Sequence, residues 1–278
     1  MKNSIGIMQG RLTEPHGRGI QFFPFSEWEQ EFALAKECSL DEVEFIFDYH
    51  RYQENPLMSE VGISRIKDLS KKHKIAVNHI CADFFMVQPF YRVSEDKRKA
   101  NINMLNKLIV QASKIGAQNI EIPLVDNSSI KNNDEKNILI ESIRECLPTA
   151  EKYGIMLSLE TDLKPPEFAS LVESFAHKLI KANYDSGNSS ALGYDSKEEI
   201  GVIGKYIFNI HVKDRLVGGT TVNLGEGDAD FDRLFKALKE LGYSGSFILQ
   251  GARGKDGEEV ETIKKYVKFL KNNIKSLF

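Results

Sequence analysis

The sequence has few cysteines and no long apolar run, and each absence excludes a class of protein. Its three cysteines, Cys38, Cys81 and Cys146, form no Cys-x-x-Cys pair. We therefore expect reduced thiols rather than a disulfide framework or a structural zinc site. No apolar stretch approaches the roughly 20 residues that a membrane span requires. The opening MKNSIGIMQGR has too short an apolar stretch for a signal peptide, so we expect a cytoplasmic protein.

The chain also lacks an excess of positive charge. Its 37 Lys and Arg residues are outnumbered by 40 Asp and Glu residues, for a net charge of −3. This balance predicts neither nucleic acid nor an anionic membrane as a partner. The hydrophobic fraction of 41% and the charged fraction of 28% are those of an ordinary globular protein. No linker, low-complexity tract or shift in composition divides the chain, so residues 1–278 are expected to form a single domain.

Short β-branched runs alternate with longer helical patterns along the chain. Gly116, Gly154 and Gly242 each follow a helical segment and precede a strand by a few residues, as C-terminal caps do. Eight strands are predicted, at Ser4–Met8, Glu42–Phe47, Ile75–His79, Asn119–Ile122, Ile155–Glu160, Ala182–Asp185, Ile207–Val212 and Ser246–Gln250.

This alternation predicts an α/β fold, a single (β/α)8 TIM barrel. Strands joined through helices are parallel, because each crossover returns the chain to the same edge of the sheet. The length of 278 residues suits such a barrel, which typically needs about 250. The alternative is an open doubly wound sheet. It is disfavoured because no glycine-rich fingerprint follows the first strand.

Four consecutive predicted strands end on polar side chains, namely Glu160, Asp185, His211 and Gln250. Active sites of these barrels lie at the carboxyl ends of the strands. Three oxygen donors and one imidazole suit a fairly hard divalent cation such as Mn²⁺, Mg²⁺ or Co²⁺. Taken singly, each residue has a simpler structural interpretation as a turn, a salt bridge or a buried hydrogen bond. Their shared position at successive strand ends favours the metal site.

The sequence resembles the xylose isomerase-like TIM barrels, and within them the sugar-phosphate isomerases and epimerases. The resemblance rests on LSLETD around Glu160, NYDSGN around Asp185, HVKDR around His211 and ILQ ending at Gln250, with the opening GIMQGRL and the segment LGEGDADF. It covers nearly the whole chain, and LGEGDADF is its most specific element. It implies one divalent cation per chain, with Mn²⁺ expected first and Mg²⁺, Co²⁺ or Zn²⁺ as alternatives. It also implies a small-molecule sugar or sugar phosphate as substrate, and a homodimer or homotetramer.

The departure from the family is Gln250. In the ketose 3-epimerases of this family, two metal-bound glutamates act on opposite faces of the sugar, and the resemblance places Gln250 where one of them is expected. An amide oxygen can bind a metal but cannot exchange a proton. Aldose–ketose interconversion needs proton transfer on one face only. The amide therefore favours an isomerase with Glu160 as the catalytic base, or an epimerase with a second base elsewhere. The sequence leaves that base open among His79, Asp83, Glu121 and Asp126.

Cationic side chains after strands one, seven and eight predict an anionic group on the substrate, because arginine forks match phosphate or carboxylate oxygens. The competing interpretation is that these cations pair with nearby carboxylates. For His79, a packing role is the simpler interpretation. The predicted substrate-binding residues are Arg11, His79, Asn188, Lys213, Arg215 and Arg253.

Three other functions compete with this one. An abasic-site endonuclease of the same superfamily needs further histidines for a cluster of three zinc ions, but Asn188 stands where one is expected and no histidine follows His211. A barrel that binds sugar without turnover stays open, because Gln250 removes a proton-transfer group without affecting the fold. A metal-dependent dehydratase of a polyol derivative also stays open.

Overall fold

The protein, described here by a computed structural model of residues 3–275, is a closed barrel of eight parallel strands. This confirms the predicted fold class and excludes the open sheet, because β1 pairs with both β2 and β10. The predicted domain limits, residues 1 and 278, lie outside the described residues. The order around the barrel is β1-β10-β7-β6-β5-β4-β3-β2. The barrel strands are β1 (Ile5–Met8), β2 (Glu42–Ile46), β3 (His79–Cys81), β4 (Asn119–Leu124), β5 (Met156–Thr161), β6 (Ile180–Asp185), β7 (Ile207–Val212) and β10 (Ser246–Leu249).

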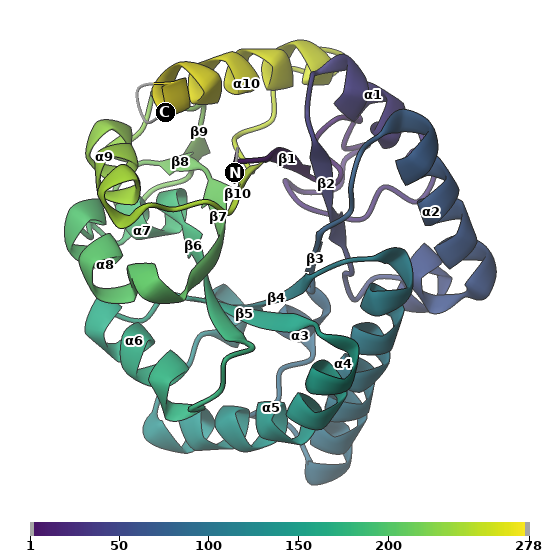
Figure 1. Ribbon diagram of the computed structural model, residues 1–278, viewed down its shortest axis with the longest axis vertical. Coiled ribbons are helices and arrows are strands. Elements are labelled where there is room, and N and C mark those ends of the chain that lie inside the picture. The colour runs from purple at the N-terminus through teal and green to yellow at the C-terminus, as the bar shows by residue number, and fades with distance from the viewer. Residues whose placement is uncertain (1–2, 276–278) are drawn as a thin grey trace.

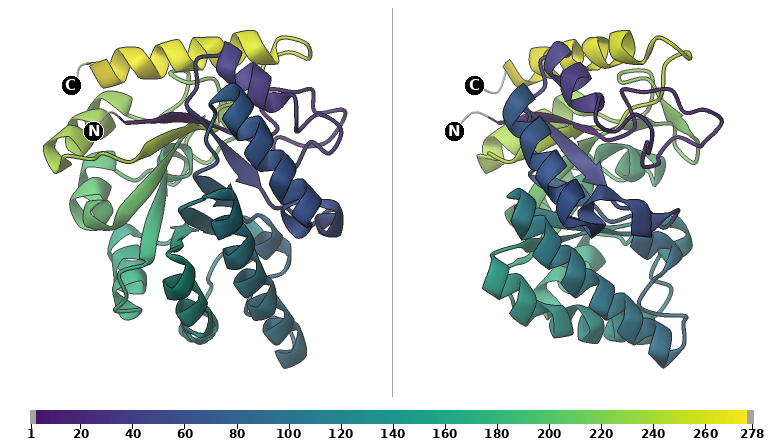
Figure 2. Two further views of the ribbon diagram at one scale, coloured as in Figure 1. Left: turned by 45° about the vertical axis from the view of Figure 1, so that its right-hand side comes forward. Right: turned by 90° about the vertical axis from the view of Figure 1, so that its right-hand side faces the viewer.

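Helices form an outer ring around the strands (Figure 1). The first and last parts of the chain lie side by side, and Figure 2 shows this in purple and yellow. The α-helices are α1 (Glu31–Glu37), α2 (Glu60–His73), α3 (Phe84–Val87), α4 (Glu95–Ile115), α5 (Asn133–Tyr153), α6 (Pro165–Ser174), α7 (Ser186–Ala191), α8 (Ser196–Ile203), α9 (Phe231–Leu241) and α10 (Glu259–Lys275). The short 3-10 helices are η1 (Tyr52–Glu54), η2 (Pro56–Met58), η3 (Asp126–Ser128) and η4 (Gly204–Tyr206).

The predicted glycine caps are confirmed. Gly116, Gly154 and Gly242 end α4, α5 and α9 with φ values of 81°, 68° and 72°, a left-handed conformation that costs glycine little. At the other end of α9, the Asp230 side chain accepts a hydrogen bond from the Arg233 amide, as an N-cap does. Local sequence signals therefore set where these helices begin and end.

The predicted strands agree with the observed ones within two residues, except for the third. The prediction of Ile75–His79 was wrong, because β3 is His79–Cys81 and shares only its first residue with the predicted range. Ile75 and Val77 before it are buried, but Ala76 forms only an isolated bridge to Glu42. Consequently, His79 lies at the amino end of the barrel and Cys81 at the carboxyl end.

A two-stranded antiparallel sheet, β8 (Asp214–Arg215) with β9 (Thr221–Val222), follows β7. Buried Asp214 accepts hydrogen bonds from the amides of Gly225, Gly227 and Ala229 at 2.8, 2.9 and 3.1 Å. These contacts fix the LGEGDADF segment beside the barrel rim. No helix within the described residues is long and apolar enough to cross a membrane.

Candidate metal and substrate site

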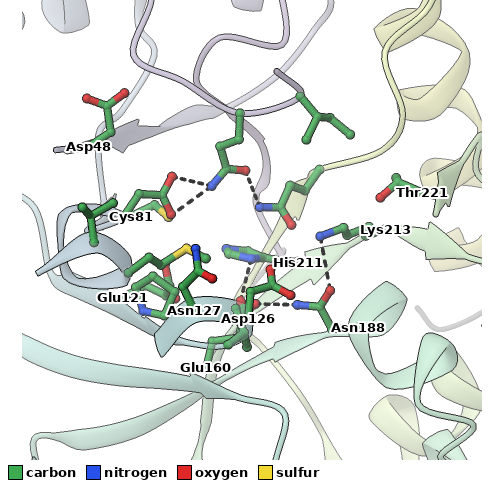
Figure 3. Close-up of a pocket in the computed structure, with 18 of the residues that line it drawn as sticks. Asp48, Cys81, Glu121, Asp126, Asn127, Glu160, Asn188, His211, Lys213 and Thr221 are labelled. Carbon is green, nitrogen blue, oxygen red and sulfur yellow. Dashed lines mark hydrogen bonds and ion pairs between the residues drawn. The ribbon is translucent and has the colours of Figure 1, made fainter. Parts of the chain in front are cut away.

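A cavity of about 840 Å³ opens at the carboxyl ends of the barrel strands. Its wall includes Glu160, His211 and Gln250, which are three of the four predicted metal ligands. The fourth, Asp185, is the last residue of β6 and pairs in register with His211 of β7. Ligand atoms of Glu160, Asp185 and His211 all lie within 4.8 Å of one another. The structure thus brings together three predicted ligands from three consecutive strands, all with buried side chains. Figure 3 shows two of them, Glu160 and His211, in the cavity wall.

Backbone amides orient Asp185, and side-chain amides orient Glu160. Asp185 caps α7, and its Oδ1 accepts the amides of Gly187 and Asn188 at 2.8 Å each. Glu160 Oε1 accepts from the Asn188 side chain at 2.7 Å, and its Oε2 accepts from Asn183 at 2.6 Å. These donors orient each carboxylate and still leave it lone pairs that can bind a cation. A preformed acidic pair of this kind suits a divalent cation.

The imidazole of His211 is fixed by a second glutamate. Its Nε2 lies 2.9 Å from Oε2 of Glu44, which is fully buried in β2, and its Nδ1 lies 3.0 Å from Glu160 Oε2. Burial alone lowers the pKa of His211, but the Glu44 and Glu160 carboxylates outweigh burial and hold that pKa well above its ordinary value. Because Nε2–H of His211 donates to Glu44, its Nδ1 is the nitrogen on the side of the Glu160 ligand. This carboxylate–histidine pairing is common behind metal ligands.

Gln250 follows β10 and has a buried carbonyl oxygen that no hydrogen-bond donor among the described residues reaches. Its amide nitrogen donates to Gln21 Oε1 at 2.7 Å. Gln21 in turn donates from Nε2 to Asp83 Oδ2 at 2.7 Å. Because Gln250 donates to Gln21 and Gln21 donates to Asp83, the orientation of both glutamine amides is defined. Gln250 Oε1 is therefore the kind of unpaired buried acceptor that a cation satisfies, and the donor set fits the predicted metal.

A cationic part of the cavity wall adjoins the triad. Lys213 Nζ lies 3.3 Å from Asn188 Oδ1 and 3.4 Å from Asp185 Oδ2. Arg215 donates to Asn188 Oδ1 at 3.0 Å and to the Gly219 carbonyl at 2.8 Å. Gly187 gives Lys213 its path, because a Cβ there would lie 2.6 Å from Lys213 Cγ. Three predicted substrate-binding residues, Asn188, Lys213 and Arg215, thus line the cavity together.

The other three predicted substrate-binding residues are not among those that line the cavity. Arg253 donates to the carbonyls of Gly10, Thr13 and Ile20, and so it anchors the loop after β1. Arg11 is buried, and burial followed by repulsion from Arg253 lowers its pKa to about 9. We do not retain either arginine as a substrate contact.

His79 is also withdrawn. The error in the third strand placed it at the rim, whereas it lies at the opposite end of the barrel. There its Nε2 is 3.1 Å from Ser246 Oγ, and its Nδ1 is 3.4 Å from Asn119 Nδ2. Its side chain is 3% exposed. The packing role, which was the simpler interpretation of the sequence, agrees with this position.

Three acidic residues of the cavity wall, Asp83, Glu121 and Asp126, are candidate second bases from the sequence. Glu121 of β4 is fully buried, and neither of its oxygens has a hydrogen-bond partner among the described residues. Burial, followed by the nearby Glu160 carboxylate, raises its pKa well above the ordinary value. Asp83, just beyond β3, is half-buried, and burial raises its pKa to about 6. Asp48, which the sequence analysis did not single out, also lines the cavity.

Comparison with known proteins relates this chain to sugar epimerases. A family model described as Xylose isomerase-like TIM barrel matches residues 32–273. L-ribulose-5-phosphate 3-epimerase UlaE of Shigella flexneri serotype 5b (strain 8401) is 27% identical over 235 residues, spanning 80% of this chain and 81% of that protein. The UlaE protein of Escherichia coli (strain K12 / DH10B) is 25% identical over 236 residues, with the same two coverages.

Two solved structures share the fold. D-psicose 3-epimerase of Clostridium cellulolyticum H10, solved with D-tagatose, superposes with a TM-score of 0.77 at 16% identity, and the match covers 99% of each chain. The IOLI protein, solved with a bound zinc atom, superposes with a TM-score of 0.80 at 18% identity, again over 99% of each chain.

Proposed function

Because the chain belongs to the xylose isomerase-like TIM barrel family, we propose that it is a divalent-metal-dependent epimerase or isomerase of a sugar phosphate, with Glu160 as the catalytic base. One observation carries the proposal. Three ligand groups from successive strands converge within 4.8 Å, and the same cavity wall contains Gln250, whose buried amide oxygen no donor among the described residues reaches. Glu160, Asp185, His211 and Gln250 would hold the cation.

The remaining chemistry follows from the side chains. A bound divalent cation would supply charge stabilisation for an enediolate. Glu160 lines the cavity and would take the proton from the carbon next to the substrate carbonyl. Asn183 and Asn188, each within 2.7 Å of a Glu160 oxygen, would keep its carboxylate oriented. The cation is expected to be Mn²⁺ first, and the zinc atom in the IOLI structure supports keeping Zn²⁺ as an alternative.

The charges along the cavity wall support a phosphorylated substrate. Lys213, Arg215 and the neighbouring Thr221 line one part of the wall, and Asp48 and Asp83 line another. A guanidinium and an ammonium next to a hydroxyl suit phosphate oxygens. The names of the UlaE relatives point to the same substrate class. We therefore choose L-ribulose 5-phosphate as the first substrate to test, within a panel of ketose phosphates.

Solvent exchange tests this proposal. The Mn²⁺-loaded protein is incubated in D₂O with each ketose phosphate, and deuterium at the carbon next to the carbonyl is followed by NMR. The proposal expects uptake with at least one substrate, together with an epimer or an aldose as product. Tight substrate binding without any uptake would instead support a barrel that binds sugar without turnover.

Replacement of Glu44 by Gln is expected to weaken Mn²⁺ binding by about 10- to 100-fold, the range typical of partners behind metal ligands. The reason is that Glu44 fixes the His211 ring through Nε2. Metal titration followed by calorimetry measures the effect. Glu42→Gln is the matched control: Glu42 is also fully buried in β2, but it bonds to Ser4 and Asn78. Equal affinity in both variants would contradict the assigned role of Glu44.

Replacement of Gln250 by Glu is expected to tighten Mn²⁺ binding, on the order of tenfold, because the shell gains a negative charge. A carboxylate cannot donate to Gln21, so Gln21 must turn its amide and lose its bond to Asp83. Competition with a metal-binding dye measures the affinity. Gln53→Glu, an exposed change of the same kind, should leave the affinity unchanged. Weaker Mn²⁺ binding by the Gln250→Glu variant would remove Gln250 from the proposed shell.

A further inference from the structure

Epimerisation through an enediolate needs proton transfer on both faces of the reacting carbon. The proposed function assigns Glu160 to one face, and Gln250 cannot act on the other because an amide does not exchange protons. If the product is an epimer, a second group must therefore line the cavity. The inference below rests on the proposed function and identifies that group.

Three of the acidic residues that line the cavity are poorly placed for this role. Glu121 is fully buried on β4, which adjoins β5, and so it lies on the same side as Glu160. Asp126 is exposed at the start of η3. Asp48 follows β2 and accepts the Phe23 amide at 2.9 Å, and among the described residues no hydrogen bond joins it to Gln21 or Gln250.

Asp83 is placed differently. It follows β3, which β4 separates from the strand of Glu160, and it is half-buried in the cavity wall. Two hydrogen bonds of 2.7 Å, through the Gln21 amide, join it to Gln250. A single side chain, that of Gln21, therefore separates Asp83 from Gln250, the position at which the expected carboxylate is missing. Its other oxygen, Oδ1, is 3.4 Å from the Cys81 thiol.

We propose that Asp83 is the second proton-transfer residue, held in place by Gln21, and that it replaces the carboxylate missing at Gln250. This assignment also explains why residue 250 is a glutamine. Gln21 donates to Asp83 and must therefore present its carbonyl to residue 250, where a donor is required. An amide at 250 meets this requirement, and a carboxylate does not.

The C–H bond at the reacting carbon breaks, its proton passes to Glu160, and its electron pair forms the carbon–carbon double bond of the enediolate. Protonated Asp83 then gives its proton to the opposite face of that carbon, and a C–H bond of inverted configuration forms as the carbonyl returns. Glu160 ends protonated and Asp83 ends ionised. Both groups line the open cavity and return to their starting states by exchange with water.

The surroundings of Asp83 suit a proton donor near neutral pH. Burial raises its pKa to about 6, and the Asp48 and Glu160 carboxylates act in the same direction. Bonds from Gln21 and from the Cys81 thiol oppose this rise. Arg11 is the charged neighbour of opposite sign. A group that ionises near the working pH can both give and regain a proton.

The test compares wild type, Asp83→Asn and Asp83→Glu, with L-ribulose 5-phosphate and its C3 epimer in D₂O. In the asparagine variant, we expect conversion to fall by about 10²- to 10⁴-fold. We expect the epimer whose C3–H bond faces Glu160 still to exchange its hydrogen for deuterium, and the other epimer to lose exchange. Asp83→Glu should restore part of the conversion. Bound Mn²⁺ per chain should equal that of wild type, and Asp68→Asn, an exposed change on α2, should alter nothing.

Each other outcome has a definite meaning. Wild-type conversion rates in Asp83→Asn would overturn the inference and leave the proposed function intact. The inference would also be overturned if wild type exchanged hydrogen for deuterium but formed only an aldose. The same holds if inversion were lost in Asp48→Asn and kept in Asp83→Asn. Equal loss of exchange from both epimers together with lost Mn²⁺ would make Asp83 structural. If wild type exchanges no ketose phosphate at all, the proposed function and this inference fall together.

Discussion

Replacement of Glu160 by Gln is expected to lower solvent exchange at the reacting carbon by about 10³- to 10⁴-fold at saturating Mn²⁺, toward the upper end of the range for loss of a general base. The amide keeps the size and one oxygen of the carboxylate but cannot accept a proton. Hydrogen exchange into the ketose phosphate, followed by NMR, measures this step without requiring net product. Saturation with metal separates the lost base from any loss of metal affinity.

The matched control is Glu167→Gln, an exposed change on α6, the helix that follows the strand of Glu160. It should exchange at the wild-type rate. Thermal unfolding of the Glu160→Gln variant is also needed, because both Asn183 and Asn188 donate to the carboxylate and an amide can accept at only one of its two ends. A folded, Mn²⁺-loaded Glu160→Gln protein with undiminished exchange would rule out Glu160 as the base.

The fold was predictable because local signals and topology agree. β7 has the predicted limits Ile207–Val212, since its apolar run is bounded by polar or turn-forming residues on both sides. Helix ends followed from glycine caps such as Gly116. The prediction of the third strand failed because Ile75 and Val77 before His79 are buried without forming a continuous ladder. Burial and strand pairing usually coincide, but here they do not. The prediction therefore placed His79 at the carboxyl end of its strand, whereas it lies at the amino end.

The site was partly predictable, for a different reason. Glu160, Asp185 and His211 could be named because strand ends meet at one rim of a barrel. Glu44 left a weaker signal: the alternation EVEFI points a carboxylate into the barrel, where it needs a partner. The partner, His211, is 167 residues away. Gln21 lies in the loop of residues 9–30, which has no periodicity, and its bond to Gln250 spans 229 residues. Pairings of this kind depend on the folded loop and not on spacing in the sequence.

Removal of a metal ligand is the second large expected effect. Asp185→Ala and His211→Ala should each weaken Mn²⁺ binding by more than about 100-fold, beyond what outer partners usually contribute. After incubation with Mn²⁺ and gel filtration, elemental analysis should find close to one equivalent per chain in wild type and little in either variant. Thermal unfolding gives an independent measurement. A free metal concentration of about 100 times Kd should stabilise wild type by about 2.7 kcal/mol, but neither variant.

Asp185→Ala removes a helix cap as well as a ligand, and these two losses must be separated. Asp185 caps α7 through bonds to two backbone amides, and Asp195 caps α8 in the same way at 3.0 Å. Loss of either cap should cost about 1 kcal/mol, so Asp195→Ala, which also removes an ion pair with Arg233, removes a cap on the neighbouring helix without touching the triad. The Asp195→Ala variant should be less stable than wild type yet bind a full equivalent of Mn²⁺ and be stabilised by it. If both aspartate variants bind Mn²⁺ as wild type does, Asp185 is only a cap, and the convergence of the three strand ends is structural.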